Sequence, residues 1–323
     1  MDLSKHEIKI TDMKAFKVGN AQNIEAATGC TVILCPEGAS AGVSVVGGSP
    51  ASRETQLLNP VNTVQKIHAV SLSGGSAYGL EAGDGVMRFL EEKGIGFDTG
   101  FGLVPIVCGA SLFDLELVTN KVRPDKAMGY QACVNAYSGR EPEMGNFGAG
   151  TGATVGKWLG AAAYMKSGLG IYAVQLGALQ VAALVSVHIM AGLLNADKTG
   201  FADTCDAMYQ TVEQTRELWG SHPDPEIASH TNTTISCILT NARLDKCQCN
   251  KLAAIANDGY ARGIRPVHTS ADGDSIFVMA SGEVEVGFDA VAALACECMA
   301  RAINRSASEA APAYGLLSAQ SFQ

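Results

Sequence analysis

Three groups of polar residues have the types and spacing that could support chemistry. The first is a junction, where the Pro- and His-bearing stretch 221–232 runs directly into Thr233 and a β-branched segment. If the chain were cut before Thr233, that residue would carry a hydroxyl and a free α-amine. An amine with a pKa of about 7.7–8.0 is a usable base at neutral pH, and such a Thr–amine pair is an activated nucleophile. By spacing alone, the junction also fits an ordinary loop that enters a strand at Thr.

The second group is Asp272-Gly273-Asp274, directly before an apolar stretch. Two carboxylates so close together could orient a hydroxyl or accept its proton. The alternative is a simple turn, because Asp-Gly is a common turn pair. A calcium loop is not indicated, because no Glu closes it at the required distance.

The third group is the glycine-rich stretch 145–158, which carries Lys157 near its end. A phosphate loop needs Gly, four residues and then Gly-Lys followed by Ser or Thr. Thr151 stands where the first Gly is required, and Trp158 follows the lysine. A dinucleotide fingerprint starting at Gly148 lacks the apolar strand that must precede it. We therefore expect a nest or closely packed turn here, with Lys157 against a tightly built site.

Composition sets limits on the class of protein. The chain has 323 residues, 47% hydrophobic and 17% charged, which is typical of a globular protein with a large core of one or two domains. The net charge of −9, without a Lys/Arg run, makes nucleic acid or an anionic membrane an unexpected partner. The first 16 residues resemble no signal peptide, and the longest apolar run, Val181–Val187, is far short of the roughly 20 residues of a membrane span. We expect a soluble cytoplasmic protein.

The ten cysteines are expected to be free thiols in that compartment. Two C-x-C pairs occur, Cys247 with Cys249 and Cys296 with Cys298, both in segments with helical character. Residues two apart on a helix point away from each other, so buried small side chains are favoured over a metal site.

The pattern of apolar residues predicts a mixture of strands and helices. β-Branched runs at 31–35 and 42–46 predict a hairpin around the turn PEGAS. Because strict β–α–β alternation is absent, the order favours an α/β sandwich with antiparallel or mixed sheets. Further strands are expected at 64–72, 110–118, 171–186, 233–240 and 275–280, helices at 76–93, 201–219, 245–262 and 288–304, and an exposed loop at 221–232.

Several segments together resemble the L-aminopeptidase/D-esterase family, peptidase family S58, which includes β-peptidyl aminopeptidases and nylon-oligomer hydrolases. The segments occur in family order and span roughly residues 27–280. They are GVSVVGGSPASRET (42–55), GGSAYGLEAGDGV (74–86), FDL (113–115), GAGTGATVGK (148–157), TNTTISCILTNARL (231–244) and GIRPVHTSADGDSIF (263–277).

The resemblance implies an N-terminal-nucleophile hydrolase with an αββα four-layer sandwich. Such chains cleave themselves once, and both pieces stay in one structural domain. The family's cut corresponds to Asn232–Thr233, which gives a large subunit of residues 1–232 and a small subunit of residues 233–323, with Thr233 as nucleophile. The family's carboxylates match Asp272 and Asp274, and its active-site lysine matches Lys157. A homotetramer of such pairs is also implied.

The sequence departs from the family pattern at three positions. Some members have a Tyr in the oxyanion region, where Phe113 precedes Asp114 here. Members usually carry an Asn at a strand position where His188 is the nearest match, and a His can still donate through a ring N–H. Val46 replaces an Arg of many relatives, which bears on substrate preference.

These observations predict a self-processing N-terminal-threonine amidohydrolase or aminopeptidase that cleaves short peptides or related amides through an acyl-enzyme. Asp272 and Asp274 would orient the hydroxyl and amine of Thr233, and Lys157 would favour the charged tetrahedral state. No metal or organic cofactor is implied. Two alternatives remain open at this point: an acyltransferase of the ornithine-acetyltransferase type, and an unprocessed, non-catalytic relative.

Overall fold

A computed structural model describes residues 2–157, 164–189, 192–193 and 232–322. The helix predicted at 201–219 and all of the loop predicted at 221–232 except Asn232 lie outside these residues.

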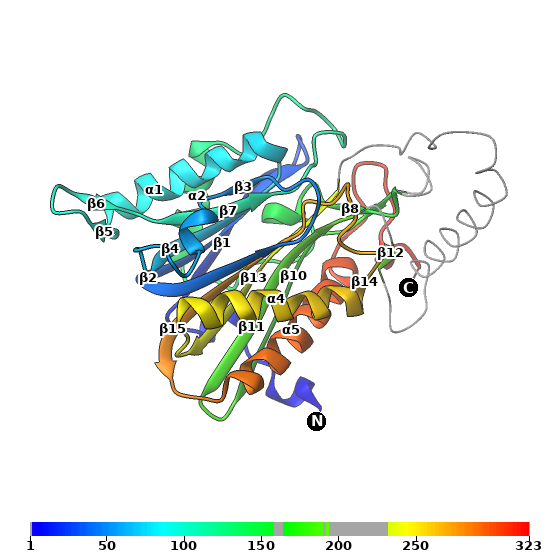
Figure 1. The fold of residues 1–323 in the computed structure, drawn as a ribbon. Coiled ribbons are helices and arrows are strands. Elements are labelled where there is room, and N and C mark those ends of the chain that lie inside the picture. Colours follow the sequence, from blue (N-terminus) through cyan, green and yellow to red (C-terminus); the bar gives the residue numbers. More distant parts are fainter. Residues whose placement is uncertain (1, 158–163, 190–191, 194–231, 323) are drawn as a thin grey trace, which may run out of the picture.

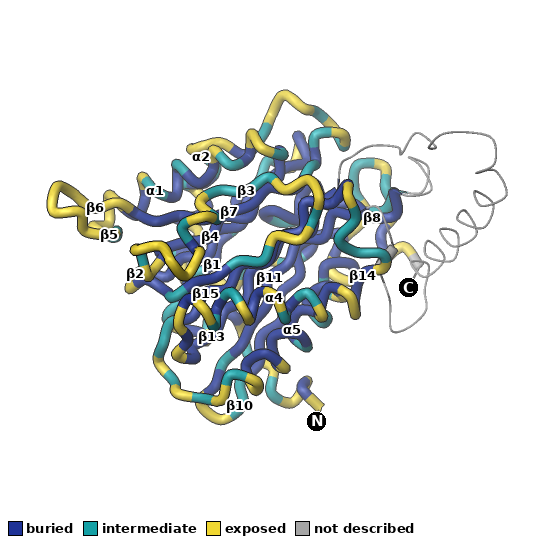
Figure 2. Tube along the Cα trace, in the orientation of Figure 1, coloured by how far each residue is buried: buried dark blue, intermediate teal, exposed yellow. Residues whose placement is uncertain are grey.

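Three separate apolar layers show that the chain forms four stacked layers of secondary structure. One layer lies between the first sheet, which contains β10, β11, β13, β15 and the end of β2, and helices α4 (Lys246–Gly263) and α5 (Phe288–Ser308). A second fills the space between two sheets, and a third lies between the second sheet and helices α1 (Ala82–Glu92) and α2 (Lys126–Tyr137). Figure 1 shows the two helix pairs on opposite outer faces, and Figure 2 shows the strands between them buried. The αββα prediction is confirmed.

Both sheets are mixed, as predicted. In the first sheet β13 and β15 run parallel and the other neighbours run antiparallel. In the second sheet only β4 and β7 are parallel. The strands are β1 (Lys17–Asn23), β2 (Thr28–Val45), β3 (Ser52–Arg53), β4 (Ile67–Ser73), β7 (Val107–Ser111), β10 (Leu169–Leu176), β11 (Leu179–His188), β13 (Thr233–Ala242) and β15 (Ser275–Val284).

The predicted hairpin over 31–46 is wrong, because this segment is the single strand β2. Its first half pairs with β1 and β4, and its last residues pair with β15 in the other sheet. Gly38 adopts a left-handed φ of 75°, and the register with β4 shifts between Leu34 and Ala39. The PEGAS segment therefore bends the strand from one sheet to the other instead of reversing it.

Two other strand predictions need correction. The single strand expected at 171–186 is the hairpin β10–β11, which turns at Gly177 with a φ of 60°. The strand expected at 110–118 ends at Ser111, so 112–118 is not a strand. The segment 171–186 is almost continuously apolar, so its sequence pattern does not distinguish one long strand from two paired strands.

The helix predictions at the C-terminal end are confirmed. α4 begins at a capping box, in which the Asp245 carboxylate accepts from the Gln248 N–H and the Gln248 side chain returns to the Asp245 backbone. The predicted helix 76–93 begins as the 3₁₀ segment η4 (Ser76–Glu81) and continues as α1. The other short elements are η1 (Leu3–His6), η2 (Ile10–Asp12), η3 (Gln56–Leu58), β5 (Phe97–Asp98), β6 (Leu103–Val104), η5 (Gly148–Gly150), β8 (Thr154–Val155), β9 (Met165–Lys166), β12 (Gly192–Leu193), β14 (Ile264–Arg265) and η8 (Ala319–Phe322).

The nine cysteines within the described residues are all free thiols, as predicted. Most are buried in the apolar layers. Among the described helices, none is long and apolar enough to cross a membrane.

Candidate active site

Thr233 stands at the first position of β13, in the interior of the first sheet. Its pairing partner on β11 is His188. Ile235, two residues further on, points into the layer between the sheets, so by strand alternation Thr233 faces the same layer. Only 4% of Thr233 is exposed, and its hydroxyl donates to the carbonyl oxygen of Asn232. The attacking oxygen of the predicted cut therefore lies against the peptide group that would be cut.

A backbone donor meets the same carbonyl group. The Gly273 N–H donates to the Asn232 oxygen over 2.9 Å, and Asn232 forms a parallel bridge with Asp272. Gly273 has no room for a side chain, because a Cβ atom there would lie 2.7 Å from the Thr233 hydroxyl oxygen and 2.8 Å from the Ser49 carbonyl oxygen. The loop that contains Gly273 thus presses its backbone directly onto the threonine.

Asp272 is buried beside this carbonyl. One carboxylate oxygen accepts from the backbone N–H of Thr269 at 2.7 Å and from its hydroxyl at 2.6 Å. The other oxygen, Oδ1, is buried and has no hydrogen-bond partner among the described residues. Burial raises the pKa of Asp272 to about 6, and the nearby charge of Asp274 adds to the rise. Asp272 is therefore a carboxylate that can change protonation state near neutral pH.

Asp274 contacts the strand one residue after the threonine. Its Oδ1 accepts from the Thr234 N–H at 2.7 Å. Its Oδ2 accepts from both the backbone N–H and the ring Nδ1 of His268, at 3.1 and 2.8 Å. Asp274 thus fixes the backbone of β13 directly after Thr233, and its bonds go to that backbone and to His268.

Lys157 is fully buried next to His188. Its Nζ lies 3.0 Å from the Glu116 carboxylate and also contacts Nε2 of His188. The ring of Tyr164 lies 5.8 Å from Nζ. Burial lowers the pKa of Lys157 to about 8, against the opposing influence of Glu116. The structure therefore brings Lys157 to the end of β11 that pairs with Thr233.

The tautomer of His188 follows from its other ring nitrogen. The backbone N–H of Thr154 donates to Nδ1 at 3.1 Å, so Nδ1 carries no proton in this arrangement. A neutral ring then holds its proton on Nε2, the atom that faces Lys157, and this N–H can bond to Nζ only when Lys157 is a neutral amine. This ring N–H is the donor that the sequence suggested for an oxyanion, and here it is directed at the lysine.

Phe113 and Asp114 lie in the segment after β7. The buried Asp114 carboxylate accepts from the Thr28 hydroxyl at 2.7 Å and from the Gly75 N–H at 2.6 Å. Burial raises the pKa of Asp114 to about 6. Asp114 thus ties the turn at Gly74–Gly75 to the start of β2. Half-buried Phe113 has no polar side-chain atom to donate.

The glycine-rich stretch is a closely packed turn built around a second buried lysine. Lys166 donates to the carbonyl oxygens of Gly150 at 2.9 Å and Ala153 at 3.0 Å, and also to Ser167. Burial lowers the pKa of Lys166 to about 7. These bonds hold the backbone that leads to Lys157.

Sequence reasoning missed three polar residues around the site: Glu116, Lys166 and His268. Glu116 and His268 lie within or one residue beyond segments that carried the family resemblance, FDL and GIRPVHTSADGDSIF, which is the one signal that could have drawn attention to them. Lys166 follows the glycine-rich stretch without a motif of its own.

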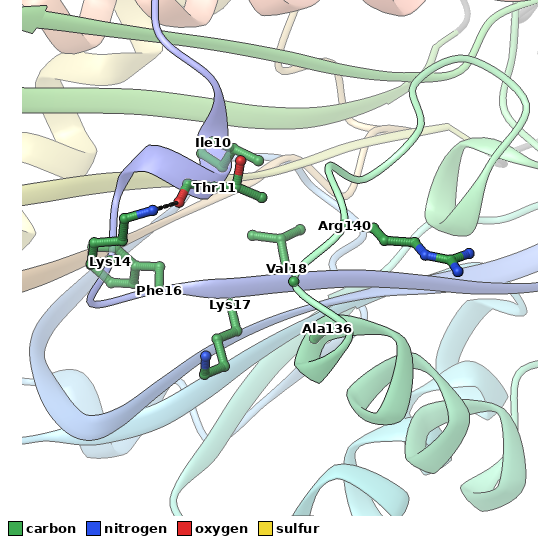
Figure 3. Close-up of a pocket in the computed structure, with 9 residues that line it drawn as sticks. Ile10, Thr11, Lys14, Phe16, Lys17, Val18, Ala136 and Arg140 are labelled. Atoms are coloured by element: carbon green, nitrogen blue, oxygen red, sulfur yellow. Dashed lines mark hydrogen bonds between the residues drawn. The ribbon is translucent and has the colours of Figure 1, made fainter.

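Two further cavities share no residue with this group. One, of about 290 Å³, lies between η2, β1 and the end of α2, with Lys14, Lys17 and Arg140 on its rim (Figure 3). There the Lys14 ammonium donates to the Thr11 carbonyl oxygen at 2.9 Å. A groove of about 500 Å³ runs along the edge of β2 beside Pro50 and η3. Within the described residues, no group of three His, Cys, Asp or Glu side chains is placed to hold a metal ion.

Comparison with known proteins assigns the family. The profile of peptidase family S58 matches residues 9–320. An uncharacterized aminopeptidase of Mycobacterium tuberculosis is 36% identical over 337 residues, covering 95% of both chains. A 6-aminohexanoate-oligomer endohydrolase of Agromyces sp. is 32% identical over 281 residues, covering 85% of this chain and 75% of that protein. The chain belongs to peptidase family S58 and is a hydrolase.

Solved structures show the same fold. A β-aminopeptidase of Burkholderia sp. superposes with a TM-score of 0.67 at 20% identity, over 94% of this chain and 86% of that one. The L-aminopeptidase D-Ala-esterase/amidase of Ochrobactrum anthropi, described as a variant of the N-terminal-nucleophile hydrolase fold, gives a TM-score of 0.67 at 18% identity, with the same coverage. The fold expected from the sequence is therefore confirmed.

Proposed function

We propose that the protein is a self-processing amidohydrolase in which Thr233 first cleaves its own peptide bond to Asn232 and then serves as an N-terminal nucleophile. The observation that carries this proposal is the junction itself. The Thr233 hydroxyl contacts the Asn232 carbonyl group, and the Gly273 N–H donates to the same oxygen at 2.9 Å.

Self-cleavage begins when the Thr233 hydroxyl oxygen attacks the Asn232 carbonyl carbon. The negative charge that develops on the carbonyl oxygen is stabilised by the Gly273 N–H, as a fixed backbone donor can do. The carbon–nitrogen bond then breaks and the nitrogen gains a proton, which leaves an ester. Water hydrolyses this ester to a carboxylate at Asn232 and a free hydroxyl and amine on Thr233.

This first step needs a base other than the amine of Thr233, whose nitrogen is still in the peptide bond. Asp272 suits that role, because its Oδ1 has no partner among the described residues and its pKa is raised to about 6 by burial. Lys157 and Asp274 are the other charged groups at the junction. Lys157 in its cationic form would stabilise the negative tetrahedral state, because it contacts His188, the residue that pairs with Thr233.

Turnover then follows with the new amine as base. The Thr233 oxygen attacks the substrate carbonyl, the amine accepts the hydroxyl proton and returns it to the leaving amine, and an acyl-enzyme ester forms. Water releases the acyl group by the same path in reverse. Nothing in this cycle requires a metal or an organic cofactor.

The substrates we propose are short peptides or related amides. Relatives carry the names aminopeptidase and 6-aminohexanoate-oligomer endohydrolase, which both denote cleavage of amide-linked chains. We further propose that the two fragments remain associated and that such pairs form a homotetramer.

With a net charge of −9, the protein is not suited to nucleic acid or an anionic membrane. We also propose that it is cytoplasmic.

The experiment is a pair of assays on the purified chain and on Thr233→Ala. Aminoacyl-anilides and a soluble 6-aminohexanoate oligomer serve as probes, with and without a free amino acid as acceptor. We expect the unaltered protein to release amine from at least one probe and the variant to release none. Amine release that persists in Thr233→Ala would contradict the proposed nucleophile, and product formed only with the acceptor would show transfer in place of hydrolysis.

A further inference from the structure

His268 lies directly behind Asp274, on the side of the sheet that α4 covers. Its backbone N–H and its ring Nδ1 both donate to one oxygen of Asp274, at 3.1 and 2.8 Å. The other oxygen of Asp274 accepts from the Thr234 N–H at 2.7 Å. A chain of hydrogen bonds thus joins His268 to the peptide group immediately after the nucleophile.

The ring of His268 is held in one orientation by its surroundings. It stacks on Tyr260 of α4, with ring centroids 5.8 Å apart. The Tyr260 hydroxyl in turn bonds to Ser236 at 2.8 Å and reaches the carbonyl oxygens of Thr234 and Ser275, both at 3.3 Å. The stacking partner of His268 is therefore fixed to the first residues of both β13 and β15.

His268 also adopts a backbone conformation that most residues avoid. Its φ is 60°, in the left-handed region, where a side chain other than Gly, Asn or Asp is uncommon. This conformation turns both the N–H group and the ring toward the same carboxylate oxygen. A strained residue retained beside a reactive group is a reason to look for a role at that group.

We propose that His268 is a positioning residue for the reaction of Thr233: by holding the Asp274 carboxylate with two donors, it sets the position of the peptide that follows the nucleophile. This inference rests on the proposed function. Without the ring donor, the carboxylate can rotate away from the Thr234 N–H, which would then lose its partner in a buried place. The threonine hydroxyl would move with that peptide, away from the attack geometry.

The charged groups around His268 predict a signature in the pH profile. Asp274 contacts the ring directly, and Tyr260 stacks on its face. Asp272 lies in the same loop as His268 and interacts electrostatically with both His268 and Lys157. A positive charge on His268 lowers the pKa of Asp272, against the burial that raises it. Removal of the imidazole therefore moves the acidic limb of self-cleavage to higher pH.

The test compares His268→Ala with His268→Asn. Asparagine tolerates the left-handed backbone and keeps an N–H donor near the position of Nδ1. We expect His268→Ala to slow both self-cleavage and kcat by roughly 10- to 100-fold, the scale of a small displacement in an active site. We expect His268→Asn to recover most of this loss. His68→Ala is the control. His68 lies in β4, outside the site, and its buried ring also takes part in a hydrogen bond, because it accepts from the Ile106 N–H at 3.1 Å.

Two readouts separate positioning from loss of fold. Hydrogen exchange at the Thr234 amide should speed up in His268→Ala but not in His268→Asn or His68→Ala, at equal folded fraction by circular dichroism. The acidic limb should move to higher pH in both His268 variants, because both lose the imidazole charge, and should stay in place in His68→Ala. Unchanged rates and exchange in His268→Ala would overturn the positioning role, as would equal loss in both His268 variants. If the unaltered protein neither cleaves itself nor hydrolyses amides, the proposed function is wrong, whatever the two His268 variants do.

Discussion

The proposed role of Thr233 depends on the contact between two atoms, its own hydroxyl oxygen and the carbonyl oxygen of Asn232. The Thr233 hydroxyl contacts the preceding carbonyl group, which is the group it attacks in the proposed cleavage, and the Gly273 N–H donates to the same carbonyl oxygen. The residue type supplies the oxygen, and the strand supplies the position.

Substitution of Thr233 tests both steps at once. Thr233→Ala removes the attacking oxygen, so we expect no self-cleavage and no hydrolysis. Thr233→Ser keeps the oxygen and the amine but loses the methyl group that restricts rotation, so we expect a slower but measurable rate of each. Gel electrophoresis and amine release measure the two steps. Full cleavage of Thr233→Ala would contradict the assignment.

The pH dependence of self-cleavage reports on two buried groups. As the pH falls through about 6, Asp272 gains a proton and can no longer act as a base. As the pH rises through about 8, Lys157 loses its positive charge, which in the proposed mechanism stabilises the tetrahedral state. We expect the precursor of a slow variant such as Thr233→Ser to cleave fastest between about pH 6 and 8. A rate that is constant from pH 5 to pH 9 would argue against both roles.

At the scale of elements, the site is formed where three strands of one sheet begin or end. β11 ends at His188, β13 begins at Thr233, and the loop before β15 carries both carboxylates. Gly273 allows that loop to approach the threonine, since its missing side chain leaves room for the hydroxyl.

Gly273→Ala should therefore disturb the junction without opening the core. Its Cβ atom would lie 2.7 Å from the Thr233 hydroxyl oxygen, closer than real Cβ contacts allow, so the hydroxyl must move. We expect self-cleavage to slow by about 10²-fold, as for a misplacement of this size. Gly287→Ala is the matched control, because nothing lies within 4 Å of its added Cβ. Equal cleavage rates in the two variants would show that the close approach is unimportant.

Much of the element order was predictable from sequence, because long periodic segments define it. The helices predicted at 245–262 and 288–304 and the strand predicted from Thr233 onward have clear sequence patterns, and all three occur in the structure. β2 was not predictable as one strand, since a bend and a reversal at PEGAS use the same turn residues. Its two halves pair with partners more than 200 residues apart in the chain, which local propensity does not record.

The candidate site residues were predicted from family motifs and not from periodicity. Thr233, Asp272 and Lys157 were named because family motifs mark them. Glu116, Lys166 and His268 escaped notice because their importance comes from contacts made only in the folded chain. A lysine that donates to three carbonyl groups resembles any surface lysine when seen as a letter in the sequence.

At the scale of the whole molecule, the proposed cut falls inside a sheet and not between domains. β13 pairs with β11 on one side and with β15 on the other, so residues 233–323 supply inner strands and both helices of one outer layer. Neither fragment has a complete core of its own.

The two fragments should therefore remain together after cleavage. We expect a single peak in native size-exclusion chromatography that contains both fragments in equal amounts, and we expect them to separate only in denaturant. Its mass should be a multiple of 33.5 kDa if pairs assemble further. Elution of the small fragment by itself under native conditions would contradict a shared core.

The most direct test of the central claim is the intact mass of the purified protein, followed by N-terminal sequencing of the smaller product. We expect two species of about 24 and about 9 kDa, in proportion to residues 1–232 and 233–323 of a 33.5 kDa chain, and a small fragment that reads Thr-Thr-Ile-Ser. A single species of 33.5 kDa that nevertheless hydrolyses amides, or a small fragment with any other first residue, would contradict Thr233 as the N-terminal nucleophile.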